Sequence, residues 1–200
     1  MSTRGRPRNF DRDQALDAAM TLFWEKGYSA TSISELCSAM DIGSPSLYAA
    51  FTSKEALYVE AVTRYREVVT PSIWKPVYEV SPVREAVEQF LMESADVLTL
   101  KGRPGGCMVT LSNVGSEGPQ SLGCWVQDLR QTGVMKLEER IAEAVAEGEL
   151  PADTDVQTFA RFIIGVQQGM SVQARDGASR ESLQQVARMA MTVWPVCSQD

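Results

Sequence analysis

The sequence predicts an all-α protein. Apolar residues recur at intervals of three and four in one long segment after another, which is the spacing of a helix face. No segment shows the apolar-polar alternation of a strand, and Ser-x-x-Glu or Ser-Pro patterns stand where several helical segments begin. With 200 residues, of which 44% are hydrophobic, the chain is long enough to bury a substantial core in one or two domains.

The first expected helix follows residues 1–10 and extends to Gly27. Asp11, with Gln14 three residues later, is typical of a helix N-terminus, and a glycine commonly ends a helix. Its inward face should consist of Leu16, Ala19, Met20 and Phe23. This helix should brace the two short helices predicted after it.

Two short helices should follow, joined by a tight turn of about three residues. Ser32 and Glu35 have the spacing of a capping box, which opens the first of them. Ser44-Pro45 starts the second, with Ser44 or the preceding glycine as its cap, and this helix should end near Phe51.

Longer helices are expected in the rest of the chain. Thr52 and Glu55 repeat the capping pattern, and the helix that they open should end near Thr70, before a proline. Ser81-Pro82 opens a further expected helix, which the glycine and proline of 101–106 close. The remaining expected helices lie at 119–147, 155–174 and 180–194, with a short apolar segment at 107–114.

Composition and charge exclude several classes of protein. Nineteen basic and 26 acidic residues give a net charge of −7, which argues against a protein that coats nucleic acid through bulk charge, although a local basic site is allowed. No apolar run reaches the roughly 18 to 20 residues needed to cross a bilayer, so we expect no membrane partner. The absence of histidine excludes Ser-His-Asp and Cys-His catalysis. Four widely spaced cysteines, with no secretory signal before them, favour the reducing cytoplasm.

The two short helices, with the longer one before them, have the layout of a helix-turn-helix. In that motif the second short helix enters the major groove of DNA while the others hold it in place. Leu47 and Phe51 lie four residues apart and should point inward. The side chains near the start of this helix, which could reach the groove, are Ser44, Pro45, Ser46, Tyr48 and Ala49.

One block within this region has a more specific pattern. It consists of Ala18-Ala19-Met20-Thr21-Leu22-Phe23, Lys26-Gly27-Tyr28, Thr31-Ser32-Ile33-Ser34-Glu35-Leu36, Ser46-Leu47-Tyr48, Phe51 and Ser53-Lys54-Glu55-Ala56-Leu57. The block resembles the DNA-binding domain of the TetR family of bacterial transcriptional regulators. The resemblance covers residues 9–57, and the later helices fit the family only in number and order.

The resemblance implies a chain of three parts. These are a flexible basic arm at 1–10, a helix-turn-helix DNA-binding domain at 11–57, and a larger helical effector-binding and dimerisation domain at 58–200. It also implies a ligand-responsive transcriptional regulator, with repression favoured over activation. Such a regulator binds a near-palindromic operator in double-stranded DNA as a homodimer, and a small-molecule effector releases it.

The resemblance further assigns DNA contacts. Tyr48 and Lys54 would hold backbone phosphates, while Thr31 and Ser32 would present a helix N-terminus, whose partial positive charge attracts phosphate. The groove-facing residues would be Ser44, Pro45, Ser46 and Ala49. Many relatives have Ser-Lys-Gly-Thr where residues 43–46 read Gly-Ser-Pro-Ser, so base readout is harder to predict.

The arginines of the N-terminal arm are the remaining DNA candidates. Arg4, Arg6 and Arg8 give the first ten residues a charge of +3, with no acid among them. Arginines on flexible arms enter the narrow minor groove in other DNA-binding proteins. We therefore expect minor-groove or phosphate contact here, and the alternative is a solvated tail.

Two apolar stripes near the C-terminus predict a homodimer. Apolar residues repeat with helical spacing through 159–170 in one helix and through 183–194 in the next. The resemblance implies that these helices form a four-helix bundle with a second copy, whereas the alternative is that both stripes pack within one subunit. The expected interface residues are Phe162, Val166, Val186, Ala190 and Trp194.

The resemblance places an effector pocket among the middle helices. Its candidate lining residues are Phe90, Met108, Leu111, Trp125, Leu129 and Met170, which would favour an apolar or aromatic effector and could equally be plain core. Cys107 is a candidate sensor thiol, because Gly-Cys at this place is similar to a TetR subgroup with electrophile-sensing members. A short helix starting at Cys107 would lower the pKa of the thiol, whereas the alternative is a cysteine that only fills space.

Two classes outside the family are the alternatives, a helical enzyme and a helical protein-binding adaptor without DNA binding. The acidic pairs Glu138-Glu139 and Asp153-Asp155 could nominally supply carboxylates, but neighbouring acids are usually solvated. No phosphate-binding loop or metal-ligand cluster accompanies them in the sequence, so we expect no enzymatic activity, no cofactor and no metal site. Retardation of a DNA duplex would separate a regulator from an adaptor.

Overall fold

The structure, a computed structural model that describes residues 11–195, is built from α-helices, and the all-α prediction is confirmed for that part of the chain. The helices are α1 (Arg12–Lys26), α2 (Ile33–Ala39), α3 (Ser44–Phe51), α4 (Lys54–Val68), α5 (Pro71–Glu79), α6 (Val83–Leu98), α7 (Val114–Glu117), α8 (Gln120–Ala146), α9 (Val156–Arg175), α10 (Arg180–Ala190) and the short 3₁₀ helix η1 (Met191–Val193). The arm residues Arg4, Arg6 and Arg8 lie outside the described residues. None of the helices described is long and apolar enough to span a membrane.

Local capping explains where the first helices begin. The Asp11 carboxylate accepts hydrogen bonds from the backbone N–H groups of Asp13 and Gln14, and so caps α1. Ser32 and Glu35 form the reciprocal capping box that the sequence predicts at the start of α2. These caps satisfy N–H groups that have no partner within the helix, which fixes where α1 and α2 begin.

Two boundaries differ from the sequence prediction, and the structure decides a third that was left open. Of the two candidate caps of α3, Gly43 is the N-cap, which leaves Ser44 as the first helical residue. The hydroxyl of Ser53, not of Thr52, caps α4, because Thr52 adopts a left-handed backbone conformation (φ 65°) in the turn. The last helix also ends early, since α10 stops at Ala190 and η1 follows it.

Two further segments differ in type. Pro71 was expected only to stop the preceding helix, but it also begins α5, since proline is well tolerated in the first turn of a helix. Residues 108–111 form a turn, and the short helix of this region, α7, starts only at Val114. The short helix expected at Cys107 is therefore wrong.

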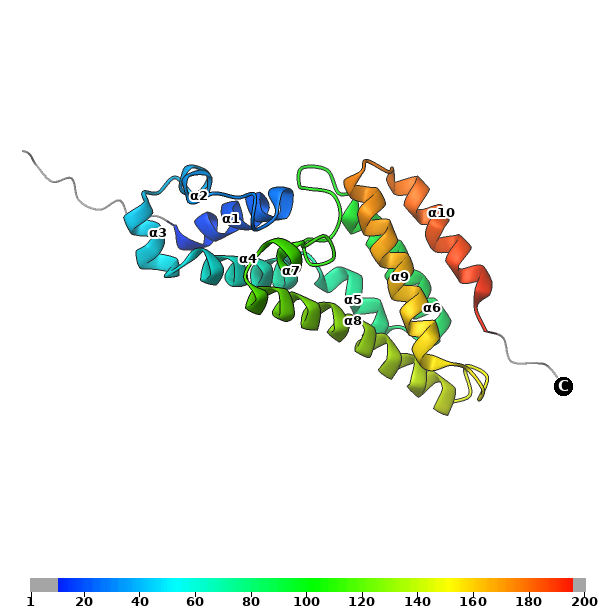
Figure 1. The fold of residues 1–200 in the computed structure, drawn as a ribbon. Helices are drawn as coiled ribbons and strands as arrows, with labels where there is room; N and C mark the ends of the chain where they lie inside the picture. The colour runs from blue at the N-terminus through cyan, green and yellow to red at the C-terminus, as the bar shows by residue number, and fades with distance from the viewer. Residues whose placement is uncertain (1–10, 196–200) are drawn as a thin grey trace, which may run out of the picture.

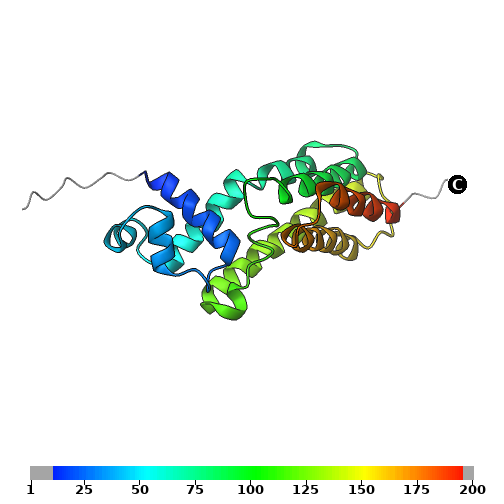
Figure 2. The same ribbon diagram turned by 90° about the horizontal axis from the view of Figure 1, so that it is seen from above.

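The helices are arranged as an elongated molecule with two buried cores (Figure 1). Helices α1 to α3 lie at one end, and α6, α9 and α10 lie at the other, as the view from above also shows (Figure 2). One core joins α1–α4 to the loop after α6 and to the first turns of α8; the other joins α5, α6, α9 and α10 to the rest of α8. Helix α4 runs without a break through residue 57, where we expected a domain boundary, and Tyr65 near its end still belongs to the first core.

Candidate nucleic-acid interface and internal cavity

Helix α3 is held by two buried side chains and presents its other face to solvent. Leu47 and Phe51 are buried in the core formed with α1, α2 and α4. The guanidinium carbon of Arg12 lies 4.4 Å from the centre of the Phe51 ring, which packs α1 onto the end of α3. The exposed residues are Ser44, Pro45, Ser46, Tyr48 and Ala49, the set that the sequence assigns to the groove. Their contact with DNA stays a prediction.

In the turn before α2, the two neighbouring residues expected to contact phosphate differ in exposure. Ser32 is exposed and accepts a hydrogen bond from the N–H of Glu35. Thr31 is fully buried, and its hydroxyl donates to the carbonyl of Gly27 at 2.7 Å. Thr31 therefore braces the turn between α1 and α2, and its side chain presents no surface to phosphate, which corrects its assignment as a DNA contact.

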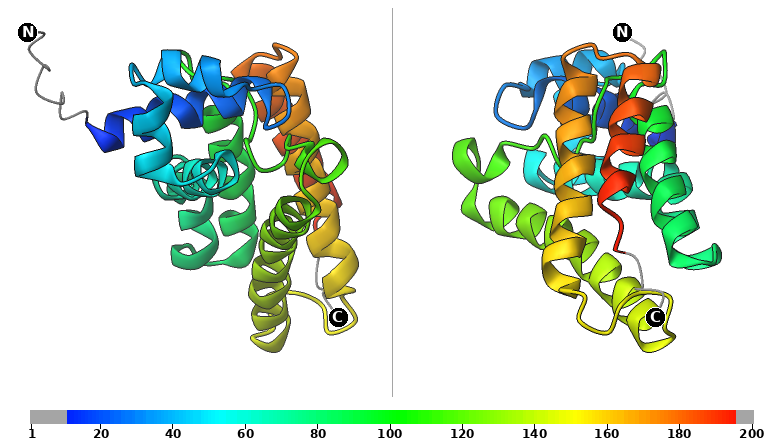
Figure 3. Two further views of the ribbon diagram at one scale, coloured as in Figure 1. Left: turned by 60° about the vertical axis from the view of Figure 1, so that its left-hand side comes forward. Right: turned by 90° about the vertical axis from the view of Figure 1, so that its right-hand side faces the viewer.

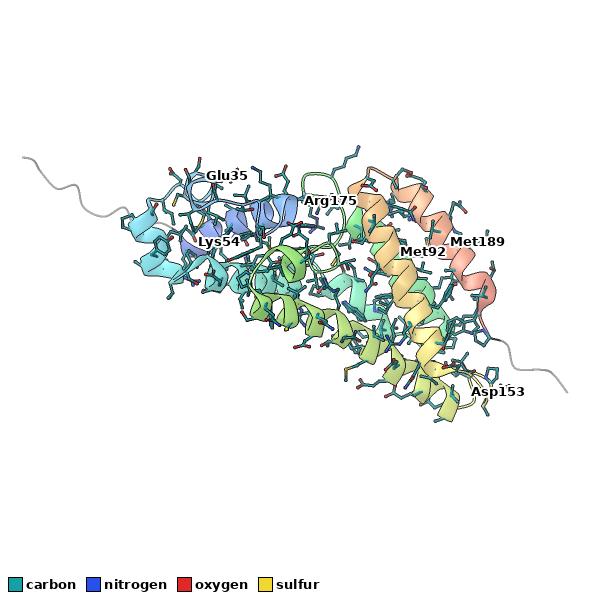
Figure 4. All side chains as sticks on the ribbon, in the orientation of Figure 1. Glu35, Lys54, Met92, Asp153, Arg175 and Met189 are labelled. Carbon is teal, nitrogen blue, oxygen red and sulfur yellow. The ribbon has the colours of Figure 1, made fainter. Side chains whose placement is uncertain are left out.

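Lys54 lies at the junction of α3 and α4 (Figure 4), where an aromatic ring and a carboxylate position it. Its ammonium nitrogen is 4.3 Å from the centre of the Tyr28 ring. The Tyr28 hydroxyl donates to Glu55 at 2.9 Å, and burial together with this hydrogen bond raises the pKa of Tyr28 to about 12. Partial burial lowers the pKa of Lys54. The contact with the Tyr28 ring holds the half-buried ammonium beside α3.

Acidic residues outnumber basic ones in the described part of this region. Residues 11–57 contain seven acids and only three bases, Arg12, Lys26 and Lys54. Arg12 is paired with Glu60, and Lys26 is hydrogen-bonded to Glu35, whose pKa that ammonium lowers to about 2. Lys54 makes no ion pair within residues 11–195 at a distance of 4.0 Å or less. It is the cation of this region that is free to meet phosphate.

An apolar groove runs along the exposed face of α9 and α10. In Figure 3 (right) these two helices lie side by side at the surface. Phe162 is 39% exposed and Met189 is 69% exposed, and Figure 4 labels Met189 on the outer side of α10. The groove is lined by Phe162, Val166, Ser182, Gln185, Val186, Met189, Ala190, Thr192 and Val193. Four of the five residues expected at a dimer interface therefore lie on one continuous surface.

The fifth residue, Trp194, does not line this groove. Its ring packs edge-on against Phe159, with ring centres 5.1 Å apart, and it adds to the core of its own subunit. The chain turns after Ala190 into η1, so the helical spacing that predicted a common face for residues 183–194 ends before Trp194. A substitution of Trp194 would thus disturb the fold of one subunit as well as any contact between two.

A cavity of about 570 Å³ lies between the end of α4, α5, the loop after α6, α8 and α9. Its volume is in the range of small-molecule sites. Of the six residues expected to line a pocket, Leu129 is on its wall. Phe90 and Met170 are in the core of α5, α6 and α9, while Met108 and Trp125 pack in or against the other core, and Leu111 is half-buried beside Gly106. Methionine and aromatic residues predict burial well, but they do not say which of them faces a void.

The cavity wall also contains polar and charged residues that sequence analysis missed. They include Arg66, Lys75, Arg130 and Lys136, together with Glu79, Thr70, Ser72, Thr110, Gln167 and Gln168. These residues come from four helices and a loop, and no motif or spacing in the sequence connects them. Trp74 is on the same wall because it belongs to α5, a helix that the sequence does not predict.

Cys107 is half-buried and lines the cavity. Its backbone N–H donates to the buried hydroxyl of Ser171 at 2.7 Å, which fixes the loop against α9. Cys107 stands directly before a turn and not at the N-terminus of a helix, so the helix-dipole argument for its reactivity is wrong. The neighbouring hydroxyl of Tyr65 is buried, and this burial raises the pKa of Tyr65 well above its ordinary value.

The same loop joins the cavity to α1. The indole N–H of Trp24 donates to the carbonyl of Gly106 at 3.0 Å. Arg175, at the end of α9, donates to the carbonyls of Gly105, Trp24 and Glu25 at 2.8, 2.8 and 3.1 Å. Figure 4 shows Arg175 where α9 meets the end of α1. A displacement of the loop by a molecule in the cavity would therefore act directly on the helix that braces α3.

Comparison with known proteins agrees with this architecture. A model of the family described as "Bacterial regulatory proteins, tetR family" matches residues 15–61, and "Tetracyclin repressor-like, C-terminal domain" matches residues 84–190. The Escherichia coli (strain K12) repressor ComR is 37% identical over 197 residues, which cover 96% of this chain and 93% of ComR. The repressor BdcR of the same strain is 33% identical over 186 residues, with coverage of 93% and 90%.

A solved structure gives the same result in three dimensions. The chain superposes with a TM-score of 0.89 on a cysteine mutant of the TetR family regulator CifR in complex with a 26-bp double-strand operator DNA. The two are 37% identical, and the alignment covers 96% of this chain and all of that one. The sequence resemblance, the helix-turn-helix and the matches over both halves agree: the chain belongs to the TetR family of bacterial transcriptional regulators.

Proposed function

We propose that this protein is a transcriptional repressor that binds a near-palindromic operator as a homodimer and is released when a small molecule occupies its cavity. The observation that carries the proposal is the exposed face of α3, which includes Tyr48 and has the half-buried Lys54 beside it. Leu47 and Phe51 anchor the helix in the core. Repression is favoured because ComR and BdcR are both named as repressors. The cytoplasm follows as its location, because the operator lies there.

The homodimer follows from the groove on α9 and α10. An apolar surface of this kind is rare on a monomer and marks an interaction site. Two copies related by a two-fold axis would cover each other's grooves. Each copy would then present one α3 helix to one operator half-site. The effector would act through the loop at 105–112, because that loop lines the cavity with Cys107, Val109 and Thr110 and bonds to Trp24 of α1.

Replacing Lys54 by alanine should weaken binding to operator and to unrelated DNA alike. A phosphate contact carries no sequence information, so both affinities should fall by a similar factor. The slope of log K against log salt concentration should shrink by roughly 0.9 for the one phosphate charge lost. Fluorescence anisotropy with a labelled duplex at several salt concentrations measures both quantities.

Lys101→Ala is the matched control, because Lys101 is exposed on the loop after α6 and should leave the salt slope unchanged. Tyr48→Phe separates the hydroxyl of the other predicted phosphate contact from its ring. Full affinity with an unchanged slope in Lys54→Ala would remove Lys54 from the interface. Failure of the wild type to retard any duplex, including DNA taken from beside its own gene, would favour the protein-binding adaptor.

A thiol sensor is the second candidate for the release step. The observation that favours it is the position of Cys107 on the cavity wall, in the loop that bonds to α1. Addition of the thiol sulfur to the electrophilic carbon of an unsaturated aldehyde would place a covalent group in the cavity, with the thiol proton passing to the adduct. We prefer reversible binding, because the cavity already has room for a ligand and needs no special chemistry.

The two routes predict opposite responses to a thiol-reactive aldehyde. We expect the operator affinities of wild-type protein and of Cys107→Ser to be equally insensitive to it. Cys124→Ser is the control for modification elsewhere, because Cys124 is exposed on α8. Release of the wild type and of Cys124→Ser, with Cys107→Ser still bound, would overturn this preference and establish the thiol as sensor.

A further inference from the structure

We propose that the cavity takes an amphipathic anion, meaning a flat apolar or aromatic body that carries one carboxylate, sulfonate or phosphate group. The inference rests on the proposed function, because it names the chemical class of the effector. It adds an anionic group to the apolar or aromatic effector that the sequence favours. The observations that carry it are the charges of the cavity wall and their lack of counter-charges.

Cationic side chains dominate the charges around the cavity. Arg66, Lys75, Arg130 and Lys136 line it, whereas Glu79 is the one acid on the wall within the described residues. A chain of net charge −7 thus gathers four of its 19 basic residues around a single void. This arrangement opposes the overall charge of the protein and so points to a local requirement for positive charge.

Most of these cations lack an acidic partner. The carboxylate of Glu79 lies 3.7 Å from the ammonium of Lys75, so the wall's one acid is already engaged. Arg66 and Lys136 form no ion pair within 4.0 Å in residues 11–195. Arg130 donates from Nη1 to the carbonyls of Val109 and Ser112, which turns its guanidinium toward the loop without neutralising its charge.

The apolar part of the wall is built around Trp74. Its ring packs against Phe90, with ring centres 5.0 Å apart, and a Cβ at Gly133 would lie 3.3 Å from it. The absence of a side chain at Gly133 therefore leaves α8 close enough to shape this wall. Ile73, Leu129 and Ile164 complete a surface on which a flat apolar body can lie.

Lys136 joins the two parts of the site. Its ammonium nitrogen lies 5.1 Å from the ring centre of Trp74 and 5.4 Å from that of Tyr78, so positive charge stands at the edge of the aromatic wall. On its other side Lys136 borders an adjoining hollow lined by four acids, Glu79, Glu139, Glu143 and Glu147, with Arg140 as the second base. An anion in the cavity would meet Lys136 and Arg66 while its apolar body lies against Trp74. Arg66 is exposed and stays hydrated, so a neutral ligand would leave chiefly the half-buried Lys136 without an anion on the cavity side.

A matched pair of dyes tests the inference on the full-length protein. The anionic probe is 8-anilinonaphthalene-1-sulfonate, and the neutral probe is N-phenyl-1-naphthylamine, which has the same rings without the sulfonate. Fluorescence titration should show that wild type binds the sulfonate about tenfold more tightly than the neutral dye. Arg66→Met and Lys136→Met should each weaken sulfonate binding about fivefold and leave neutral-dye binding within about twofold, whereas Glu79→Gln should tighten sulfonate binding.

Arg84→Met is the control, because it removes the same charge from the outer surface of α6, where Arg84 pairs with Glu88. Equal affinities for the two dyes, or cavity variants that behave as this control does, would overturn the proposal. Operator binding is measured on the same samples without dye. If the wild type fails to bind operator, the proposed function is contradicted. If the wild type binds operator but shows no preference for the anionic dye, only the inference about the effector is contradicted.

Discussion

Replacing Phe162 and Met189 together by aspartate should convert the dimer into a monomer of 22.0 kDa and nearly abolish operator binding. Both side chains are exposed in one subunit and line the apolar groove of α9 and α10. Because a two-fold interface repeats each substitution, four carboxylates would have to be buried or repel one another there. A monomer has one helix-turn-helix domain and loses the gain from bivalent binding, so its operator affinity should fall by a factor of about 10²–10⁴.

Sedimentation velocity and operator titration measure the two effects on the same samples. Circular dichroism should show unchanged helix content, since neither side chain is part of the buried core of its subunit. Met135→Asp is the control, because Met135 is 55% exposed on α8 and does not line the groove. A double variant that still sediments as a dimer would place the interface on another surface.

The DNA-reading half was largely predictable because short-range signals determine it. Asp11 and the pair Ser32 and Glu35 cap their helices as expected, since capping depends on residues at most three positions apart. The inward positions of α3 followed equally from the four-residue spacing of Leu47 and Phe51. Such local signals can be read from the sequence without knowledge of the tertiary arrangement.

Burial of small polar residues was less predictable. Thr31 and Ser32 are neighbours of similar polarity, yet one is fully buried and the other is exposed. The difference arises because the chain turns between α1 and α2 and directs the Thr31 hydroxyl back to Gly27. Family resemblance assigns both residues the same role, whereas the packing of this turn gives them different ones.

The cavity was the least predictable part. Arg66 and Lys136 are 70 positions apart, and α5, which sequence analysis missed, forms one of the walls between them. The prediction instead selected large apolar residues such as Phe90 and Met170, which are fully buried in the core. Periodicity separates inside from outside, but only tertiary packing decides which inside surface borders a void.

Arg175→Gln should loosen α1 from α9 and lower operator affinity about tenfold, which corresponds to roughly 1.4 kcal/mol. The guanidinium donates to the carbonyls of Trp24 and Glu25, which lie in the last turn of α1, where carbonyl groups lack partners within the helix. A hydrogen bond from a charged donor contributes about 1.5–3 kcal/mol, and partial exposure of these bonds reduces that amount. Because α1 packs onto the end of α3 through Arg12 and Phe51, a loosened α1 should hold α3 less firmly for DNA binding.

Hydrogen exchange and operator titration distinguish loosening of this joint from general destabilisation. In Arg175→Gln the amides in the last turn of α1 and in the loop at 105–112 should exchange faster, while those in the core of α6 and α9 should keep their protection. Arg180→Gln is the matched control, since Arg180 pairs with Asp96 of α6 and, within the described residues, makes no hydrogen bond to α1 or to the loop at 105–112. If Arg175→Gln binds operator as tightly as this control does, the Arg175 hydrogen bonds do not hold α3 for DNA binding, and the cavity must act on α3 through another contact, such as the bond from Trp24 to Gly106.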